Sequence, residues 1–159
     1  MSRAAGLIVA VVLSLAFWPA AEAKEHHAGY YFPTPRSEEV YTARAQVLPD
    51  SDRARRLAFV TAFTVQMLSQ PYPPQFVVFA KGDSAEKLII VATQDHAYNT
   101  LYRARALFAM MTAVARQTPF FQDYGVEDFF TFFDLAKLLG FKNITFSDGN
   151  KFAHRIVLK

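Results

Sequence analysis

The chain has 159 residues, a formal net charge of +3 at neutral pH, no cysteine and 16 phenylalanines. This length suits a single domain, and the lack of cysteine excludes disulfides, thiolate metal ligands and thiol catalysis. Basic and acidic residues are interspersed, so the small positive excess does not indicate a nucleic-acid-binding protein.

Residues 1–23 have the three parts of a secretory signal peptide. Arg3 supplies a positive charge, residues 6–18 form an uncharged apolar run, and Ala21-Glu22-Ala23 supplies small residues at a cleavage point. The run is shorter than the roughly 20 residues that span a bilayer, which disfavours a permanent anchor. We therefore predict cleavage after Ala23, a periplasmic or extracellular protein, and no transmembrane anchor after cleavage.

Residues 24–37 show no periodicity and predict a mobile N-terminal arm. Cleavage after Ala23 places Lys24, Glu25 and His26 at the start of this arm. The free amine, two backbone amide nitrogens and the His26 imidazole can surround Cu(II) or Ni(II) in a plane. The alternative is a solvated tail that binds no metal, and no other cofactor is predicted.

The first half of the remaining chain predicts a strand, a helix and a hairpin. Residues 39–48 alternate as a strand does, and Asp50-Ser51-Asp52 forms a helix N-cap cluster. Apolar residues recur at helical spacing up to about Ser69, before a proline-rich stretch. Two apolar runs, 75–80 and 87–93, then read as a hairpin whose strands are buried on both faces.

The second half predicts two long helices and a second hairpin. A helix spans about 96–117 and is closed by Pro119, and another spans 126–139 with Gly140 as its C-terminal cap. Asp148-Gly149 between β-rich runs is a hairpin signal. We therefore predict an α+β fold for residues 38–159, with an antiparallel or mixed sheet of about five strands covered by three helices.

Several residues are candidates for partner binding. The segment Tyr30-Tyr31-Phe32 lies in the predicted arm, and Phe130 lies away from the phenylalanine-rich face of its helix. Phe130 therefore either fills the core from a second side or belongs to an exposed apolar patch.

Basic residues near a helix start offer a second candidate surface. Arg53 and Arg56 lie at the N-terminus of the first predicted helix, where cations are unfavourable. They either pair with nearby carboxylates or form a docking patch for an anionic partner or a membrane surface.

The sequence contains few features that are typical of a catalytic site. Phosphate-binding glycine loops, zinc-protease helices and the serine-hydrolase elbow are all missing. Asp95 and His96 stand where a strand hands over to a helix, and His154 lies in the last strand; with Ser84 or Ser147 they would make a hydrolase triad. The alternative is that Asp95 caps the helix and both histidines satisfy local hydrogen bonds.

Residues 38–56, 73–81 and 120–140 resemble a group of small exported bacterial proteins without an established role. Some proteins of this kind carry the name molybdopterin-guanine dinucleotide biosynthesis protein A. The nucleotidyltransferase family of that name opens with a Leu-Ala-Gly-Gly loop that holds nucleotide phosphates. This chain has six glycines, none adjacent to another, so the resemblance carries over no catalytic residue.

The sequence thus favours an exported, non-enzymatic binding or accessory protein with a protein or cell-envelope partner. The surplus of aromatic residues and the absence of a catalytic signature support this expectation. The alternatives are an exported hydrolase using Asp95, His96 or His154, and metal binding by the N-terminus of the cleaved protein.

Overall fold

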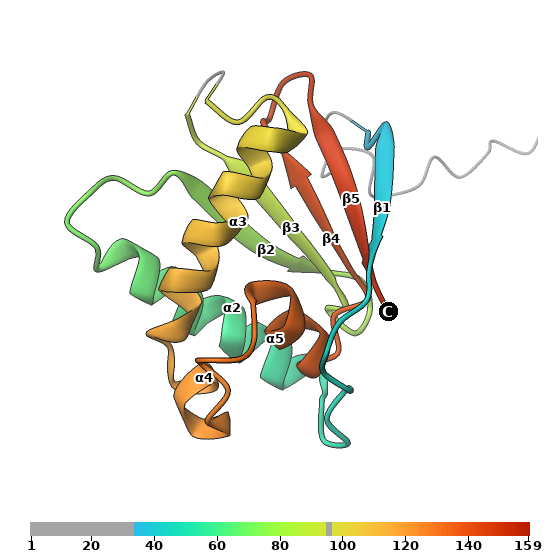
Figure 1. Ribbon diagram of the computed structural model, residues 1–159, viewed down its shortest axis with the longest axis vertical. Helices are drawn as coiled ribbons and strands as arrows, with labels where there is room; N and C mark the ends of the chain where they lie inside the picture. The colour runs from blue at the N-terminus through green and yellow to red at the C-terminus, as the bar shows by residue number, and fades with distance from the viewer. Residues whose placement is uncertain (1–33, 95–96) are drawn as a thin grey trace, which may run out of the picture.

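A computed structural model describes residues 34–94 and 97–159 of the chain. These residues form one mixed five-stranded sheet and four α-helices, which confirms the predicted α+β class (Figure 1). The strands are β1 (Ser37–Tyr41), β2 (Phe76–Lys81), β3 (Lys87–Ala92), β4 (Asn143–Ser147) and β5 (Ala153–Leu158). Their spatial order is β1-β5-β4-β3-β2, so β1 and β2 form the two edges of the sheet.

Two antiparallel hairpins make up most of the sheet. β2 pairs with β3 and β4 with β5, as the sequence predicted, and the two hairpins join through the parallel pair β3–β4. The turn of the second hairpin is held by Asp148, whose carboxylate accepts hydrogen bonds from the backbone N–H groups of Asn150, Lys151 and Phe152 at 2.8, 2.9 and 2.9 Å. β1 then adds to the sheet by pairing parallel to β5.

Four helices complete the described part of the chain. They are α2 (Arg53–Leu68), α3 (Leu101–Arg116), α4 (Pro119–Tyr124) and α5 (Phe132–Leu138). Asp52 caps α2 by accepting a hydrogen bond from the Arg55 N–H at 2.7 Å, as its place in the predicted cap cluster indicated. Among the described residues, no helix has the length and apolar character needed to cross a membrane.

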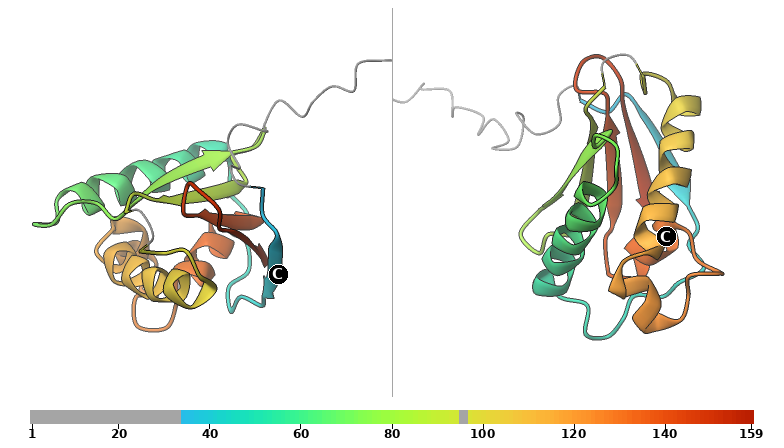
Figure 2. Two further views of the ribbon diagram at one scale, coloured as in Figure 1. Left: turned by 90° about the horizontal axis from the view of Figure 1, so that it is seen from above. Right: turned by 90° about the vertical axis from the view of Figure 1, so that its left-hand side faces the viewer.

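The helices bury one face of the sheet. Alternate residues of β2, β3, β4 and β5 face the helices, and most of them belong to the hydrophobic core. The strand residues of this core are Phe76, Val78, Leu88, Ile90, Ala92, Ile144, Phe146, Ile156 and Leu158. They meet Phe59 and Phe63 of α2, Phe108 of α3 and Phe132 of α5. The sheet is twisted, and α3 and α5 lie on its concave side (Figure 2).

The predicted strand 39–48 is wrong at both ends. β1 begins at Ser37, inside the segment assigned to the arm, and ends at Tyr41. Beyond Tyr41 the backbone leaves the sheet, because the Arg44 N–H donates to the Asp134 carboxylate at 2.8 Å and the Leu48 N–H to the Leu138 carbonyl at 3.0 Å. The segment after β1 is therefore tied to α5 rather than paired as a strand.

The predicted helix 126–139 begins too early, because residues 126–131 are not helical and only α5 (Phe132–Leu138) forms. A short helix, α4 (Pro119–Tyr124), precedes it where the sequence predicted none. Pro119 opens α4 instead of closing a helix, and its fixed φ suits the first helical position. Gly125 ends α4 in the left-handed conformation with φ 60°. α5 begins only after Thr131, whose side chain forms a capping box with Asp134.

Two further boundaries differ from the expectation. α3 begins at Leu101, after the capping residue Thr100, and not near residue 96. Burial on both faces holds for most of β3 but not for β2, where Phe79 is 47% exposed on the face away from the helices. β2 is an edge strand covered on one face only.

Candidate functional site

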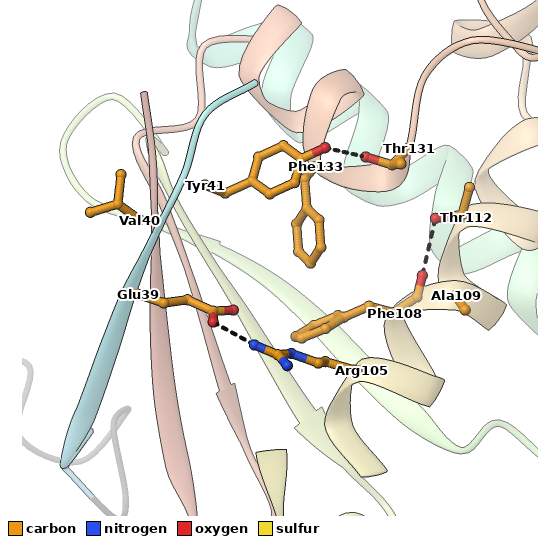
Figure 3. A pocket seen from close by; sticks show the side chains of 9 residues that line it. All are labelled: Glu39, Val40, Tyr41, Arg105, Phe108, Ala109, Thr112, Thr131 and Phe133. Atoms are coloured by element: carbon orange, nitrogen blue, oxygen red, sulfur yellow. Dashed lines mark hydrogen bonds and ion pairs between the residues drawn. The ribbon is translucent and has the colours of Figure 1, made fainter. Parts of the chain in front are cut away.

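A cleft of about 400 Å³ lies between the edge strand β1 and the helix α3. Figure 3 shows its walls, which come from β1, α3 and the start of α5. The lining residues are Glu39, Val40, Tyr41, Arg105, Phe108, Ala109, Thr112, Thr131 and Phe133. Volumes of this size are typical of small-molecule and side-chain pockets.

Three aromatic rings form the apolar part of the cleft. The Phe133 ring lies 4.9 Å from the Tyr41 ring and 4.9 Å from the Phe108 ring, measured between centroids. Phe108 is 4% exposed and also packs edge-on against Phe146 of β4. Because these rings are part of the core, the apolar wall is preformed rather than assembled on binding.

One end of the cleft is fixed by a buried carboxylate. Asp134 is fully buried and accepts hydrogen bonds from the N–H groups of Arg44 (2.8 Å) and Thr131 (2.9 Å) and from the Thr131 hydroxyl (2.9 Å). The Tyr41 hydroxyl donates to the same carboxylate at 3.3 Å. Asp134 thus joins β1, the segment after it and α5.

The other end of the cleft is charged. The Arg105 guanidinium donates to Glu39 at 2.9 Å, and the Arg105 side chain is 62% exposed. The second oxygen of Glu39 lies 3.4 Å from Nε2 of His154, and Nδ1 of His154 lies 2.8 Å from the Ser37 hydroxyl. His154 itself is 2% exposed.

Strand alternation and register bring this polar group together. Ser37, Glu39 and Tyr41 are alternate residues of β1 and share its helix-facing side. The register of β1 with β5 sets Ser37 directly beside His154. Ser37, His154 and Glu39 therefore form a serine–histidine–carboxylate group beside the cleft, with the histidine ring buried against β1.

Most of the site residues predicted from the sequence fall outside the described part of the chain. Lys24, Glu25 and His26 of the predicted metal site do so. So do the aromatic segment 30–32 and the pair Asp95 and His96. Among the described residues, no group of three or more His, Cys, Asp and Glu side chains is placed to hold a metal ion.

Arg56 does not form an exposed docking patch with Arg53. Its side chain is 6% exposed, and it donates to the Ser84 carbonyl at 2.8 Å, the Ser51 hydroxyl at 3.1 Å and the Leu139 carbonyl at 3.2 Å. Arg53 is exposed, as a docking residue must be. Arg56 is a structural residue that ties α2 to the β2–β3 turn and to the end of α5.

Phe130 is half-buried and packs against the core, so it does not belong to an exposed apolar patch. The exposed aromatic residue of this segment is its neighbour Phe129, at 69% exposure. Ser147, considered with His154 as a triad member, lies on the opposite sheet face, since its register partner is Ala153 rather than His154. The serine that His154 contacts is Ser37.

A second, more open groove of about 600 Å³ lies at the start of α2, lined in part by Asp50, Arg55, Asp123 and Tyr124. Arg55 forms an ion pair with Asp50 and donates to the Tyr124 hydroxyl at 2.7 Å. The polar side chains of this groove are therefore engaged with one another. Its walls also lack the three packed aromatic rings that line the cleft.

Sequence reasoning missed Ser37, Glu39 and Tyr41 as site residues. The alternation of Ser37, Glu39 and Tyr41 was a usable signal, since it places three polar side chains on one face of a strand. The residues near Ser37 do not indicate that this strand pairs with β5 or that it lies beside α3. Comparison with protein families, with curated proteins and with solved structures found no match to this chain.

Proposed function

We propose that this chain is an exported, non-enzymatic binding protein that holds a protein or cell-envelope partner in the cleft between β1 and α3. The cleft itself carries the proposal. It combines a preformed wall of three aromatic rings with the part-exposed Glu39–Arg105 ion pair at its rim. A few polar groups around an apolar hollow are the usual composition of a recognition site.

The cleft favours a particular kind of guest. Its volume of about 400 Å³ accommodates one or two large side chains or a small apolar group. Burying such a group against Tyr41, Phe108 and Phe133 contributes roughly 1.5–3 kcal/mol. The Thr112 hydroxyl is already engaged, since it donates to the Phe108 carbonyl and accepts from the Phe132 N–H. The guest therefore gains more from apolar contact than from hydrogen bonds to this part of the wall.

The test is site-specific photocrosslinking in cells that produce and export the protein. A diazirine-bearing amino acid at Ala109, an exposed α3 residue that lines the cleft, should give a covalent adduct with the partner. The matched control is Ala106, which is exposed on the same helix and does not line the cleft. Equal adducts from both positions, or none from Ala109, would contradict the proposal.

A hydrolase is the second candidate, because His154 contacts the Ser37 hydroxyl at 2.8 Å and Glu39 at 3.4 Å. A catalytic triad also places a histidine between a serine and a carboxylate, but with Nε2 on the serine and Nδ1 on the carboxylate, whereas here the two ring nitrogens are exchanged. The test is hydrolysis of p-nitrophenyl esters by the wild-type protein and by Ser37→Ala. Turnover above background that is lost in Ser37→Ala would favour the hydrolase over the binding protein.

The predicted export and metal site are open to one measurement, the intact mass of the exported protein with and without one equivalent of Cu(II). We expect a chain that begins at Lys24. One retained copper that is lost in His26→Ala would assign metal binding to the N-terminus. A mass that includes residues 1–23 would contradict the predicted cleavage.

A further inference from the structure

The outer edge of β1 presents backbone groups that the sheet does not use. The Lys159 N–H donates to the Tyr41 carbonyl, and the Ala43 N–H donates to the Lys159 carbonyl, each at its normal length (2.9 and 2.8 Å). Tyr41 therefore directs its backbone groups toward β5, and Glu38 and Val40, which alternate with it, direct theirs away. Since β1 ends the strand order, no described strand pairs with these groups.

The cleft opens at this same edge. Val40 lines the cleft, although its side chain belongs to the sheet face away from the helices, where its register partner is Val157. Figure 3 shows the Val40 side chain pointing away from the cleft, between Glu39 and Tyr41, which point toward it. The backbone of β1 is therefore the rim of the cleft.

We propose that an extended peptide segment of a protein partner adds to β1 as a sixth strand and places alternate side chains in the cleft. This inference rests on the proposed function and names the partner's chemistry. Strand addition at an exposed sheet edge is a common mode of peptide recognition, in which backbone hydrogen bonds give affinity and pockets for alternate side chains give specificity. β1 supplies the backbone groups and the cleft supplies the pocket.

The cleft also sets the sequence of the segment. Glu39 and Tyr41 are two residues apart, so an added strand has two successive inward side chains about 7 Å apart. The position beside Tyr41 meets Phe108 and Phe133 and selects a large apolar or aromatic residue. The position beside Glu39 meets the Glu39–Arg105 ion pair and selects a polar side chain. The recognised segment thus carries a large apolar residue and a polar residue separated by one residue.

The probe is a phage-displayed library of random decapeptides, selected against the purified exported protein. Binders should carry an apolar–x–polar pattern in one direction or the other. Val40→Pro removes the outward N–H while leaving the β5 pairing, because a proline is tolerated on an edge strand when its missing N–H faces solvent. We expect Val40→Pro to weaken a selected peptide about tenfold or more. The matched control Val40→Ala, which keeps the N–H, should bind within about threefold of wild type.

A second comparison separates this inference from the proposed function. Ala109→Trp fills the cleft and should abolish binding, whereas Ala106→Trp should not. Loss in Ala109→Trp with full binding by Val40→Pro would overturn strand addition and leave the cleft as a binding site. Unchanged binding by both variants, or a library that yields no binder, would overturn the inference.

Two further measurements test the inference without Val40→Pro, in case this variant folds poorly. In the wild-type protein, hydrogen exchange at the Val40 amide should slow on peptide binding, and unchanged exchange would overturn strand addition. Arg105→Glu should shift the selected polar position to Lys or Arg, since it replaces the ion pair at the rim by two carboxylates. An unchanged preference at this position would remove Arg105 from the recognition.

Discussion

The two edges of the sheet differ in what packs against their helix-facing sides. At β2, the buried residues Phe76 and Val78 face α2, and the Phe63 ring stacks on Phe76 at a centroid distance of 6.0 Å. At β1, the corresponding side chains are Ser37, Glu39 and Tyr41, which make polar contacts with β5, α3 and α5. One edge is sealed by apolar packing, and the other is held by hydrogen bonds around a cleft.

This difference shows how one sheet supplies both stability and a recognition surface. Apolar contact is non-directional, so the buried rings of Phe63 and Phe76 pack against each other between α2 and β2. Polar groups bond at fixed geometries, so β1 is fixed in place without being filled beneath. The cleft exists because α3 meets β1 through the long Arg105 side chain rather than through a packed apolar residue.

The largest expected effect is at the sealed edge. Phe63 is fully buried between α2 and β2, so Phe63→Ala should lower the free energy of unfolding by about 3–5 kcal/mol. The matched control is Phe129→Ala, whose ring is 69% exposed and which should change it by less than about 0.5 kcal/mol. Urea denaturation of both variants checks the pair, and similar losses would contradict the described packing.

The next effect is at the polar edge, where Asp134 is the buried acceptor that joins β1 to α5. Asp134→Asn keeps the shape but replaces one acceptor oxygen by an amide donor. We expect a loss of about 1.5–3 kcal/mol, because donors that face the carboxylate lose a charged acceptor. Asp123→Asn, at an exposed position, is the control. A loss below about 0.5 kcal/mol in thermal and urea denaturation would show that this network does not hold β1.

The sequence was a good guide where structure is local. The cap at Asp52, the alternation within the two hairpins and the turn at Asp148 depend on residues close together in the chain, and all three are confirmed. The α+β class followed from these elements. The choice between an antiparallel and a mixed sheet did not, because it depends on the parallel pairs β1–β5 and β3–β4.

The sequence was a poor guide where structure depends on distant partners. The segment after Tyr41 alternates as a strand does, yet the Arg44 N–H bonds to Asp134, far along the chain. The predicted helix 126–139 begins only at Phe132, where Asp134 forms a capping box with Thr131 and also accepts a hydrogen bond from the distant Arg44 N–H. The candidate site also depends on distant partners, because Glu39, Arg105 and His154 meet only through tertiary contacts.

A smaller effect tests the contact between β1 and β5. Ser37→Ala removes the one described hydrogen bond to Nδ1 of the buried His154. Because Ser37 is exposed and water can replace its hydroxyl, we expect a loss of about 1 kcal/mol rather than the full cost of an unpaired buried group. Ser84→Ala, an exposed serine in the β2–β3 turn, should be neutral within about 0.5 kcal/mol in the same denaturation experiment.

The smallest effect concerns Val40, on the face of β1 away from the helices. It tests whether this face of the edge strand is exposed in solution. Val40 is 54% exposed, and threonine keeps its branched shape and strand preference. Val40→Thr should therefore change the free energy of unfolding by less than about 0.5 kcal/mol. The same substitution at the other edge, Val78→Thr, places a hydroxyl at a buried site that is 6% exposed and should cost about 1–3 kcal/mol. A loss above 1 kcal/mol for Val40→Thr would mean that Val40 is covered in solution, and the two edges would then differ less than the contacts beneath them indicate.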